Sequence, residues 1–363
     1  MPKLDPATLE ISNADEYFKT YFTSPYIFHN MTKNILSRFD VIDDPVNFAR
    51  VIQLAKRPVW SVERAWGQGT ESFVDMLHRS LQKVGADLVL HTKHGDRHPI
   101  AANIHFSHHT YGKKLNTWHY KMAYLPHMFH VDRNGYSGWS SLRQETPQSL
   151  AKLPDGHVNC FFDNVVIKDR DARITKYKQL AGPAVLPENF IFVPFQVYND
   201  SVIDLCFKED YIAFARELIM CVIEEGHTVV YKLHPFGENR LIEEMLASIA
   251  SDRLIATQAS IHEILPRAEA VLTANSGVGF EALTYLKPVF CFAKADYAVA
   301  GRDILSADDL RSALRQLTAP VDQDRIKRVL YAAMRRHQVD VRSIDAMDRQ
   351  VLRVLCEHYL EQH

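Results

Sequence analysis

Cysteine is scarce in this sequence, and long apolar runs are absent. The five cysteines among 363 residues are scattered, odd in number and mostly inside apolar segments. This usage favours reduced core thiols over a disulfide framework. No window of about 18 apolar residues occurs, so we expect no membrane-spanning helix. The first residues, Met1–Pro6, lack the apolar region of a secretory signal, and we expect a cytoplasmic protein.

The sequence also lacks an excess of charge of either sign. Lys and Arg together number 42 and Asp and Glu 44, which gives a formal net charge of −2. Bulk charge therefore provides no attraction to nucleic acid, and we expect no nucleic-acid partner. A basic run does occur in the last helical segments: Arg325, Lys327, Arg328, Arg335 and Arg336. Peripheral contact with phospholipid at the inner face of the membrane is one interpretation of this run, and a solvated helix face is the other.

Signature motifs of metal enzymes and of common nucleotide folds are missing. The sequence contains neither H-E-x-x-H nor a Walker pattern. The pair Gly67 and Gly69 lacks the third glycine of a G-x-G-x-x-G turn, and a tight strand-to-helix turn explains it better. We therefore predict no metal and no other cofactor.

The length and the alternation of patterns predict two α/β domains. At 47% apolar and 24% charged residues the chain has a globular composition, and its length favours two cores. The second half alternates strands with helices, which is typical of a parallel, Rossmann-like sheet. Expected strands are 190–194, 228–233, 254–257, 270–273 and 288–292, and expected helices are 209–225, 238–251, 261–268 and 279–286.

The first half shows the same alternation of strands and helices less clearly. Strands are expected at 58–62 and 87–91, on either side of an amphipathic helix at 71–84. We predict an N-terminal acceptor-side domain over 1–182, a C-terminal ligand-binding domain over 183–320, and closing helices over 321–363 that pack back on the first domain. A hinge is expected near 181–183 and 186–188. Two Rossmann-like domains facing a central cleft constitute a GT-B-like fold.

The most informative motif is the run from Lys232 to Pro235 (KLHP), which ends an apolar strand. It is followed downstream by the turn from Asn275 to Gly277 (NSG), between another apolar strand and a helix. In open α/β sheets ligands bind beyond the carboxyl ends of the strands, and a small-residue turn at a helix N-terminus binds anions. Together the two motifs predict a pocket for a phosphorylated, nucleotide-linked small molecule.

Four motifs, in this order, resemble those of one glycosyltransferase family. They are Gly135–Ser140 (GYSGWS), Phe192–Ser201 (FVPFQVYNDS), Lys232–Pro235 and Asn275–Leu283 (NSGVGFEAL). They are similar to motifs of the β-Kdo transferases of capsular polysaccharide and lipopolysaccharide O-antigen synthesis, over roughly residues 60–292. The resemblance implies a retaining enzyme that moves Kdo from CMP-β-Kdo to a bacterial surface glycan or glycolipid through a covalent aspartyl adduct.

The resemblance also implies roles for individual residues. Asp200 would be the nucleophile, with the N-cap of the following helix as the alternative. His234 would contact the nucleotide phosphate, and a capping or packing histidine is its alternative. Ser276 would bind phosphate while also capping its helix. Glu281 would reach the ribose, unless it is a solvated helical glutamate. The remaining donor-side residues would be Gln196, Lys232, Pro235, Asn275 and Gly277.

The acceptor side is less defined. Asp132 is the candidate general base, and a turn with Asn134 and Gly135 explains it equally well. We expect the Gly135–Ser140 block to face the cleft from the first domain. Nine of the 18 histidines lie between 91 and 130, without a recognisable metal spacing. Surface histidines without a function are one interpretation, and an anionic sugar or acceptor site is the other: His105, His108 and His109 with Tyr111 and Lys113.

Two other functions remain open at this point. An inverting transferase for another CMP-activated acidic sugar, such as a sialic acid, would use the same motifs with Asp200 as base. A catalytically silent nucleotide-sugar-binding protein of polysaccharide assembly or export would bind CMP without turnover.

Overall fold

The computed structural model divides the chain into two compact units. Unit 1 is Met1–Met122, His127–Gly135 and Gln338–His363, and unit 2 is Ala123–Pro126 and Tyr136–His337. The structure describes residues 25–37, 39–42, 44–56, 58–65, 69–92, 103–179, 185–236 and 239–361. Each unit has its own six-stranded sheet covered by helices, so the predicted α/β class with two Rossmann-like domains is confirmed.

The division differs from the predicted boundary at 182/183. Residues after Tyr136 belong to unit 2 because their helices pack on α14 (Gln323–Ala332), where the rings of Phe161 and Tyr331 meet edge to face at 5.3 Å. The helices of this segment that pack on α14 are α5 (Pro147–Leu150), α6 (Asp155–Phe161) and η5 (Phe162–Val166), and α7 (Ile167–Asp171) follows η5. Of the two closing helices, α14 belongs to unit 2 and α15 (Ile344–Glu361) to unit 1. The expected hinge at 181–183 lies outside the described residues.

The sheet of unit 2 is parallel throughout, with the order β11-β10-β9-β6-β7-β8. Its strands are β6 (Phe190–Pro194), β7 (Thr228–Lys232), β8 (Leu254–Ala256), β9 (Ala268–Thr273), β10 (Val289–Cys291) and β11 (Arg302–Asp303). Strands buried on both faces are near-continuous apolar runs, which is why the sequence pattern identified β6, β9 and β10. All five residues of β6 are buried.

Side-chain caps define where several helices of unit 2 begin. Asp210, Ser260 and Ser306 each accept a backbone N–H in the first turn of the helix that follows. The helices between the strands are α8 (Ser201–Asp204), α9 (Tyr211–Glu224), α10 (Arg240–Ala247), α11 (Ile261–Ile264), α12 (Gly277–Thr284) and α13 (Ala307–Leu314). Short turns complete the unit: η3 (Ser137–Trp139), η4 (Ser141–Gln144), η6 (Asp296–Ala300) and η7 (Ala333–His337).

The sheet of unit 1 is mixed, with the order β12-β5-β4-β3-β1-β2. Its strands are β1 (Trp60–Arg64), β2 (Leu88–Thr92), β3 (Ile104–His108), β4 (Thr117–Met122), β5 (Met128–Asp132) and β12 (Gln338–Asp340). The first four are parallel, whereas β5 runs antiparallel to both β4 and β12. The last residues of the chain thus complete the sheet that its first half begins.

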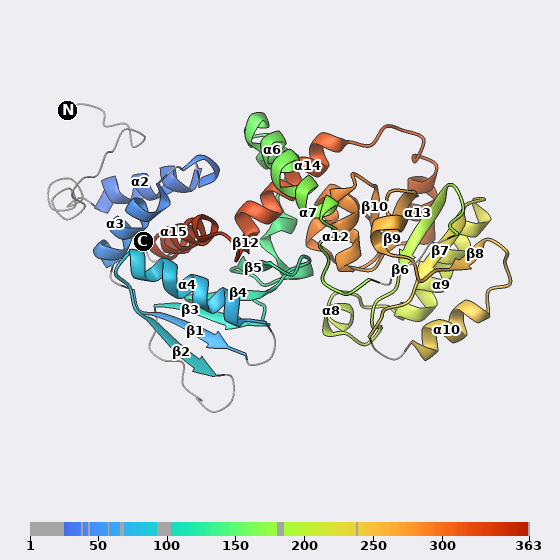
Figure 1. Ribbon diagram of the computed structural model, residues 1–363, viewed down its shortest axis with the longest axis horizontal. Coiled ribbons are helices and arrows are strands. Elements are labelled where there is room, and N and C mark those ends of the chain that lie inside the picture. The colour runs from blue at the N-terminus through green and yellow to red at the C-terminus, as the bar shows by residue number, and fades with distance from the viewer. Residues whose placement is uncertain are drawn as a thin grey trace. The chain divides into compact units, whose positions relative to one another are not determined.

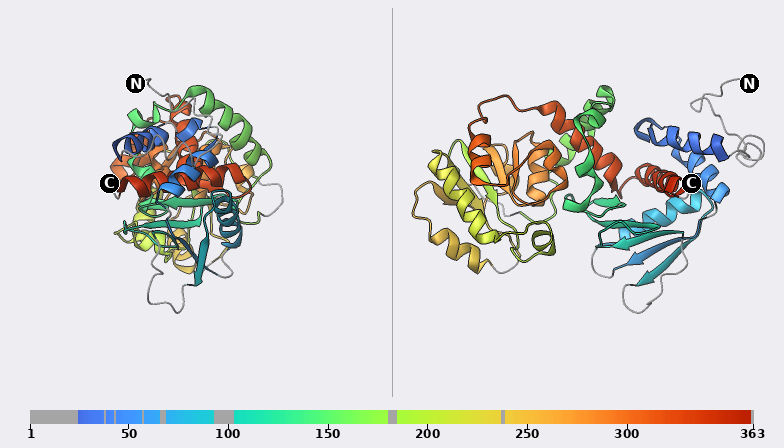
Figure 2. Two further views of the ribbon diagram at one scale, coloured as in Figure 1. Left: turned by 90° about the vertical axis from the view of Figure 1, so that its left-hand side faces the viewer. Right: turned by 180° about the vertical axis from the view of Figure 1, so that it is seen from behind.

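Helix α15 returns to the helices of the N-terminal region. It packs against α3 (Pro45–Lys56) and α4 (Glu71–Lys83), as Figures 1 and 2 show for the red helix beside the blue and cyan ones. Asp348 of α15 accepts hydrogen bonds of 2.6 Å from Ser80 and from Lys83 of α4. The unit also contains α2 (Pro25–Ser37) and η2 (Phe39–Val41). In the described ranges, no helix combines the length and the apolarity that a membrane span requires.

Candidate functional site

The candidate site of unit 2 lies where β9, β6 and β7 end. These three strands are neighbours and parallel, so the loops after their carboxyl ends meet at one edge of the sheet. Gln196 follows β6 and Asn275 follows β9, at the point where the strand order reverses, and such a point is where α/β sheets bind ligands. The Gln196 Nε2 donates to Asn275 Oδ1, and the Asn275 backbone N–H donates to Gln196 Oε1, both at 3.0 Å.

Both of these buried amides are committed to protein partners. The Asn275 Nδ2 donates further to the carbonyls of Val202 at 2.9 Å and Lys294 at 3.3 Å. These bonds fix the two loops to each other and to the start of α8, which gives Gln196 and Asn275 a structural role. Their predicted contact with a nucleotide stays a prediction.

Helix α12 begins at the turn that the sequence predicted. Ser276 is its N-cap, and its hydroxyl accepts the N–H of Val278 at 3.2 Å. The Ser276 carbonyl in turn accepts the Tyr297 hydroxyl at 2.5 Å. Gly279 is required by packing, since a Cβ at this position would lie 2.8 Å from the Tyr297 ring. The N-terminal N–H groups of this anchored helix are of the kind that binds phosphate.

His234 is held by the backbone of its own loop. Its Nδ1 lies 3.1 Å from the Phe236 nitrogen and 2.5 Å from the Phe236 oxygen. Tyr177 meets the imidazole edge to face, with ring centroids 5.2 Å apart. No hydrogen bond to Nε2 is found in the described part of the chain. The ring is therefore oriented by one nitrogen while the other can serve a ligand.

Asp200 is exposed and caps α8. Its Oδ1 accepts the N–H of Val202 and the hydroxyl of Ser201, both at 3.2 Å. The N-cap alternative is thus confirmed as a geometric fact. It does not conflict with a reactive role, because one carboxylate oxygen makes both bonds.

Lys232 is the last residue of β7, and its ammonium donates hydrogen bonds to neutral acceptors. Its Nζ donates to Gln179 Oε1 at 3.0 Å and to the Ala259 carbonyl at 2.7 Å. Burial lowers the pKa of Lys232, and the Glu263 and Glu281 carboxyls oppose this effect. The ammonium thus links the end of β7 to two other segments of unit 2.

Glu281 is buried on α12, so the alternative of a solvated helical glutamate is wrong. The Thr175 hydroxyl donates to its Oε1 at 3.3 Å, and its Oε2 has no hydrogen-bond partner among the described residues. Burial raises the pKa of the Glu281 carboxyl to about 8, against the opposing effects of Thr175 and of the Lys232 ammonium.

The Gly135–Ser140 block was expected on the first domain, and for most of its length this is wrong. Residues from Tyr136 onward belong to unit 2. The reason is close packing at Gly138, where a Cβ would lie 2.8 Å from Cys206 Sγ and 2.9 Å from the Lys294 Cβ. Since Asn275 bonds the Lys294 carbonyl, the block supports the same loops of unit 2 as the Gln196–Asn275 pair.

Asp132 belongs to unit 1 and is fully buried at the end of β5. Its Oδ1 accepts the N–H of Asn134 at 2.7 Å, which is the turn that the sequence offered as an alternative. The carboxylate also lies opposite His119 of β4 in the sheet register. The turn accounts for an aspartate at this position, and the role as general base stays a prediction.

The histidines of unit 1 mostly serve its sheet. His105 lies 2.9 Å from Ser61 Oγ and stacks on His91 at 4.9 Å. Burial and the neighbouring His91 lower the pKa of His105 to about 4, so that it is neutral at physiological pH. His108 is buried, and His109 Nε2 lies 2.9 Å from the Lys121 ammonium.

Tyr111 and Lys113 of this group are exposed, and the anionic sugar or acceptor site at these residues stays a prediction. In the ranges that the structure describes, no group of three or more His, Cys, Asp or Glu residues has a metal-binding arrangement.

The basic run near the end of the chain is engaged within unit 2. Arg328 donates to Asp324 at 2.6 Å and also bonds Asp155, and its side chain is only 12% exposed. The other members bond or contact groups of the same unit: Arg325 with Val299, Lys327 with Asn159, Arg335 with Phe161 and Arg336 with Glu145. These contacts give each basic side chain a role within unit 2, and peripheral membrane contact stays a prediction.

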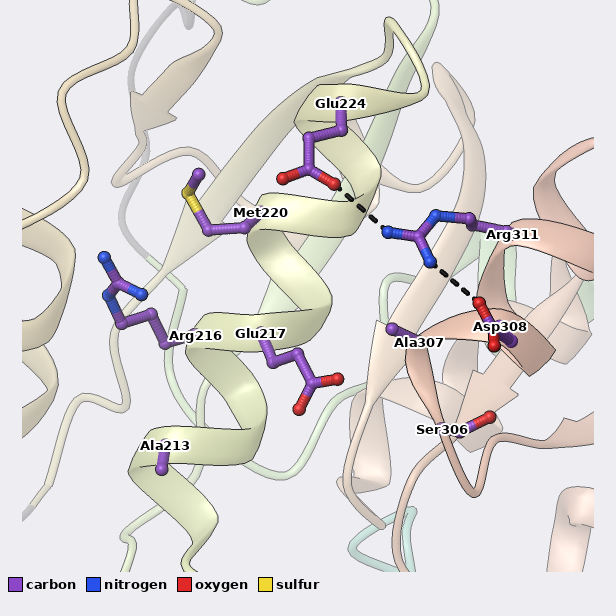
Figure 3. A pocket seen from close by; sticks show the side chains of 9 residues that line it. All are labelled: Ala213, Arg216, Glu217, Met220, Glu224, Ser306, Ala307, Asp308 and Arg311. Carbon is purple, nitrogen blue, oxygen red and sulfur yellow. Dashed lines mark hydrogen bonds and ion pairs between the residues drawn. The ribbon is translucent and has the colours of Figure 1, made fainter.

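A separate surface pocket lies between α9 and α13 and contains none of the candidate residues. Figure 3 shows Arg311 between the carboxylates of Glu224 and Asp308, at 3.2 and 2.8 Å. Arg216, on α9, donates to the neutral hydroxyl of Ser248 at 3.3 Å. Because Arg311 is paired with carboxylates of both helices, an ion-pair contact between α9 and α13 accounts for its charge.

One element of the site was missed by the sequence reasoning. Residues 175–179, called the strap below, run between α7 and the segment before β6, and three of them contact candidate residues. Thr175 bonds Glu281, Tyr177 packs on His234, and Gln179 bonds Lys232. The only signal in the sequence was a short polar and aromatic run (TKYKQ) ahead of the expected hinge.

Comparison with known proteins is consistent with this architecture. The β-Kdo 2,4 transferase KpsC of Thermosulfurimonas dismutans superimposes with a TM-score of 0.52 at 16% identity, over 81% of this chain and 98% of that chain. The β-Kdo 2,7 transferase KpsC of the same organism gives 0.48 at 16% identity, over 78% and 92%. At such identity the likeness to the first of these shows a shared fold.

Among proteins of curated function, none matches this chain. The pattern of the family described as capsule polysaccharide biosynthesis protein matches residues 160–346, just over half of the 363 residues. The matched range contains β6, β7 and β9 with the loops that form the candidate site. The chain therefore belongs to the capsule polysaccharide biosynthesis protein family.

Proposed function

We propose that this protein is a retaining glycosyltransferase that moves Kdo from CMP-β-Kdo to a bacterial surface-glycan acceptor. The observation that carries the proposal is the placement of Asp200 and His234 after two adjacent parallel strands, β6 and β7, with the N-terminus of α12 following β9 on the other side. Family membership and the fold shared with the β-Kdo transferase KpsC support it.

In the first displacement an oxygen of the Asp200 carboxylate attacks the anomeric carbon of Kdo. The bond from that carbon to the phosphate oxygen breaks, and its electron pair leaves with CMP as a phosphate monoester. The negative charge gained by the leaving group is stabilised by His234 through Nε2 and by the N–H groups at Ser276 and Gly277. Because the leaving group carries a single phosphate, we propose that no metal is needed.

In the second displacement the acceptor hydroxyl oxygen attacks the anomeric carbon from the side that CMP left. The bond to Asp200 breaks, and the carboxylate recovers its electron pair. The hydroxyl proton passes to a general base, for which Asp132 is our proposed residue. Two inversions leave the anomeric configuration unchanged.

The remaining candidate residues would bind and orient the donor. We assign the nucleotide to the loops that contain Gln196, Lys232, Pro235, Asn275 and Glu281. The acceptor would be a glycan or glycolipid, met in the cytoplasm or at the inner face of the membrane.

The experiment is a transfer assay with CMP-β-Kdo and short Kdo-terminated oligosaccharides, followed by assignment of the anomeric configuration of the product by NMR. We expect a β-linked product, which means retention. An α-linked product would instead support the inverting reaction with Asp200 as base. If the protein binds CMP and neither transfers nor hydrolyses the donor, the proposal is wrong and a non-catalytic binding protein is supported.

A further inference from the structure

The strap brings a different side chain to each of four candidate residues. Beyond the contacts of Thr175, Tyr177 and Gln179 described above, the Asp200 carboxylate favours the charged form of Lys176 and so opposes the lowering of its pKa by burial. Four side chains of the strap, those of Thr175, Lys176, Tyr177 and Gln179, are thus directed to α12, the loop after β6, the loop after β7 and the end of β7. A segment with these contacts is part of the donor side of the site.

Of the two lysines of the strap, Lys176 is the one that is not exposed. Its side chain is half-buried, and its ammonium lies 5.9 Å from the Tyr177 ring centroid. No hydrogen bond or ion pair to Lys176 is found in the part of the chain that the structure describes. Burial lowers the pKa of Lys176, and the Asp200 carboxylate opposes this effect. The same carboxylate also contributes to raising the pKa of the Tyr177 hydroxyl, and the Tyr177 ring in turn contacts both the Lys176 ammonium and His234.

The proposed reaction needs a cation at this position. Kdo is a ulosonic acid, so its carboxylate is attached directly to the anomeric carbon. When Asp200 attacks that carbon, the two carboxylates come close together, and their like charges repel each other unless a cation lies between them. Lys232 is poorly suited because Gln179 and Ala259 already bond its ammonium. Lys176 has no such commitment among the described residues.

We propose that Lys176 binds the carboxylate of the donor sugar and thereby selects ulosonic acids over neutral sugars. This inference rests on the proposed function, in which Asp200 attacks the anomeric carbon. It assigns to the strap a part of donor recognition that is separate from recognition of the nucleotide, because CMP itself lacks this carboxylate.

The test compares Lys176→Met with Lys178→Met. Lys178 is an exposed lysine of the same strap and provides a matched control. Affinity for CMP is measured by calorimetry, and release of CMP from subsaturating CMP-Kdo is measured as a rate. We expect Lys176→Met to reduce that rate by about 30-fold or more, since the half-buried cation that pairs with the donor carboxylate is lost. Its affinity for CMP should stay that of the wild type, and Lys178→Met should match the wild type in both measurements.

Three results would overturn the inference while leaving the proposed function standing. Lys176→Met could weaken CMP and CMP-Kdo equally, which would indicate a purely structural role for the strap. It could have no effect. A Lys176→Arg variant, which keeps the charge and guards against misfolding of the Met variant, could lose as much turnover as Lys176→Met. If the wild-type protein itself neither binds CMP nor releases it from CMP-Kdo, the proposed function fails, and this inference fails with it.

Discussion

Gln196 and Asn275 are joined by two hydrogen bonds of 3.0 Å that connect the loop after β6 to the loop after β9. Both residues are buried, so neither can replace the other's bonds with water. We predict that Gln196→Ala lowers the free energy of unfolding by about 2 kcal/mol, because the buried Asn275 Oδ1 and the Asn275 backbone N–H lose their partner. Urea denaturation measures the change.

The matched control for this prediction is Gln316→Ala. Gln316 also makes a side-chain bond, at 3.1 Å to Arg302, but that bond is exposed. Its loss should change the unfolding free energy by no more than about 0.5 kcal/mol. Equal effects of the two variants would contradict a structural role for the Gln196–Asn275 pair.

Two glycines of unit 2 should respond in opposite directions to alanine. Gly279→Ala would place a methyl group 2.8 Å from the Tyr297 ring, so we expect overpacking that costs about 1–3 kcal/mol. In helix α6 a Cβ at Gly156 meets no atom within 4 Å. Gly156→Ala should therefore stabilise the protein by about 0.4–1 kcal/mol through the unfolded chain. Thermal unfolding of the two variants measures both changes in stability. Equal destabilisation of the two variants would contradict the explanation that the Gly279→Ala effect comes from contact with Tyr297.

The buried carboxyl of Glu281 should make stability depend on pH. Its pKa is raised in the folded protein to about 8 from an ordinary 4.5, so the folded state binds more protons between these values. Stability should therefore fall as pH rises from about 4.5 to about 8, by an amount on the order of a few kcal/mol. Glu281→Gln keeps an acceptor for Thr175 and should remove this part of the pH dependence.

The measurement is the difference in unfolding free energy between Glu281→Gln and the wild type. It is taken at about pH 5, about pH 6.5 and about pH 8, which together span the interval between the unfolded and folded pKa values. We expect the variant to become relatively more stable as pH rises. Taking the difference cancels titrations common to both proteins, such as that of His105. A difference that does not change with pH would mean that Glu281 is ionised throughout.

Asp132 can be tested without disturbing its turn. Asparagine can accept the Asn134 N–H as aspartate does, so Asp132→Asn should fold normally. If Asp132 is the general base, transfer should fall by about 100-fold or more while the melting temperature is nearly unchanged. Asp340→Asn is the control, because Asp340 accepts the Arg342 N–H in a similar turn of unit 1. Full activity of Asp132→Asn would contradict the role of Asp132 as general base and leave only its role in the turn.

The sequence predicted unit 2 better than unit 1 for a physical reason. Strands such as β6 are buried on both faces and form unbroken apolar runs, whereas β3 (IHFSH) alternates buried and half-buried residues and includes histidines. Such a strand has the composition of a polar loop, and β3 was missed for this reason. Strands β4 (TWHYKM) and β5 (MFHVD) are mostly or fully buried, but they also include histidine and charged residues. The boundary was misplaced because packing of α5, α6 and η5 on α14 is a long-range contact that no local pattern encodes.

For the candidate site, too, local sequence patterns located some parts and missed others. Motifs that end strands or begin helices, such as those of His234 and Ser276, were located correctly in the fold. The strap was not recognised, because Thr175 and Glu281 are 106 residues apart and only the tertiary structure brings them together.

The most direct test of the account is to look for the covalent adduct on Asp200. The wild-type protein and Asp200→Asn are incubated with CMP-Kdo without acceptor, and intact-protein and peptide mass spectra are recorded. Asparagine is as good an N-cap as aspartate, so the variant should keep α8 and its stability. The account predicts a wild-type mass increase of one Kdo, located on the peptide that contains Asp200, and none in the variant. An unmodified wild-type protein that turns over the donor, or an Asp200→Asn variant that transfers Kdo at the wild-type rate, would contradict it.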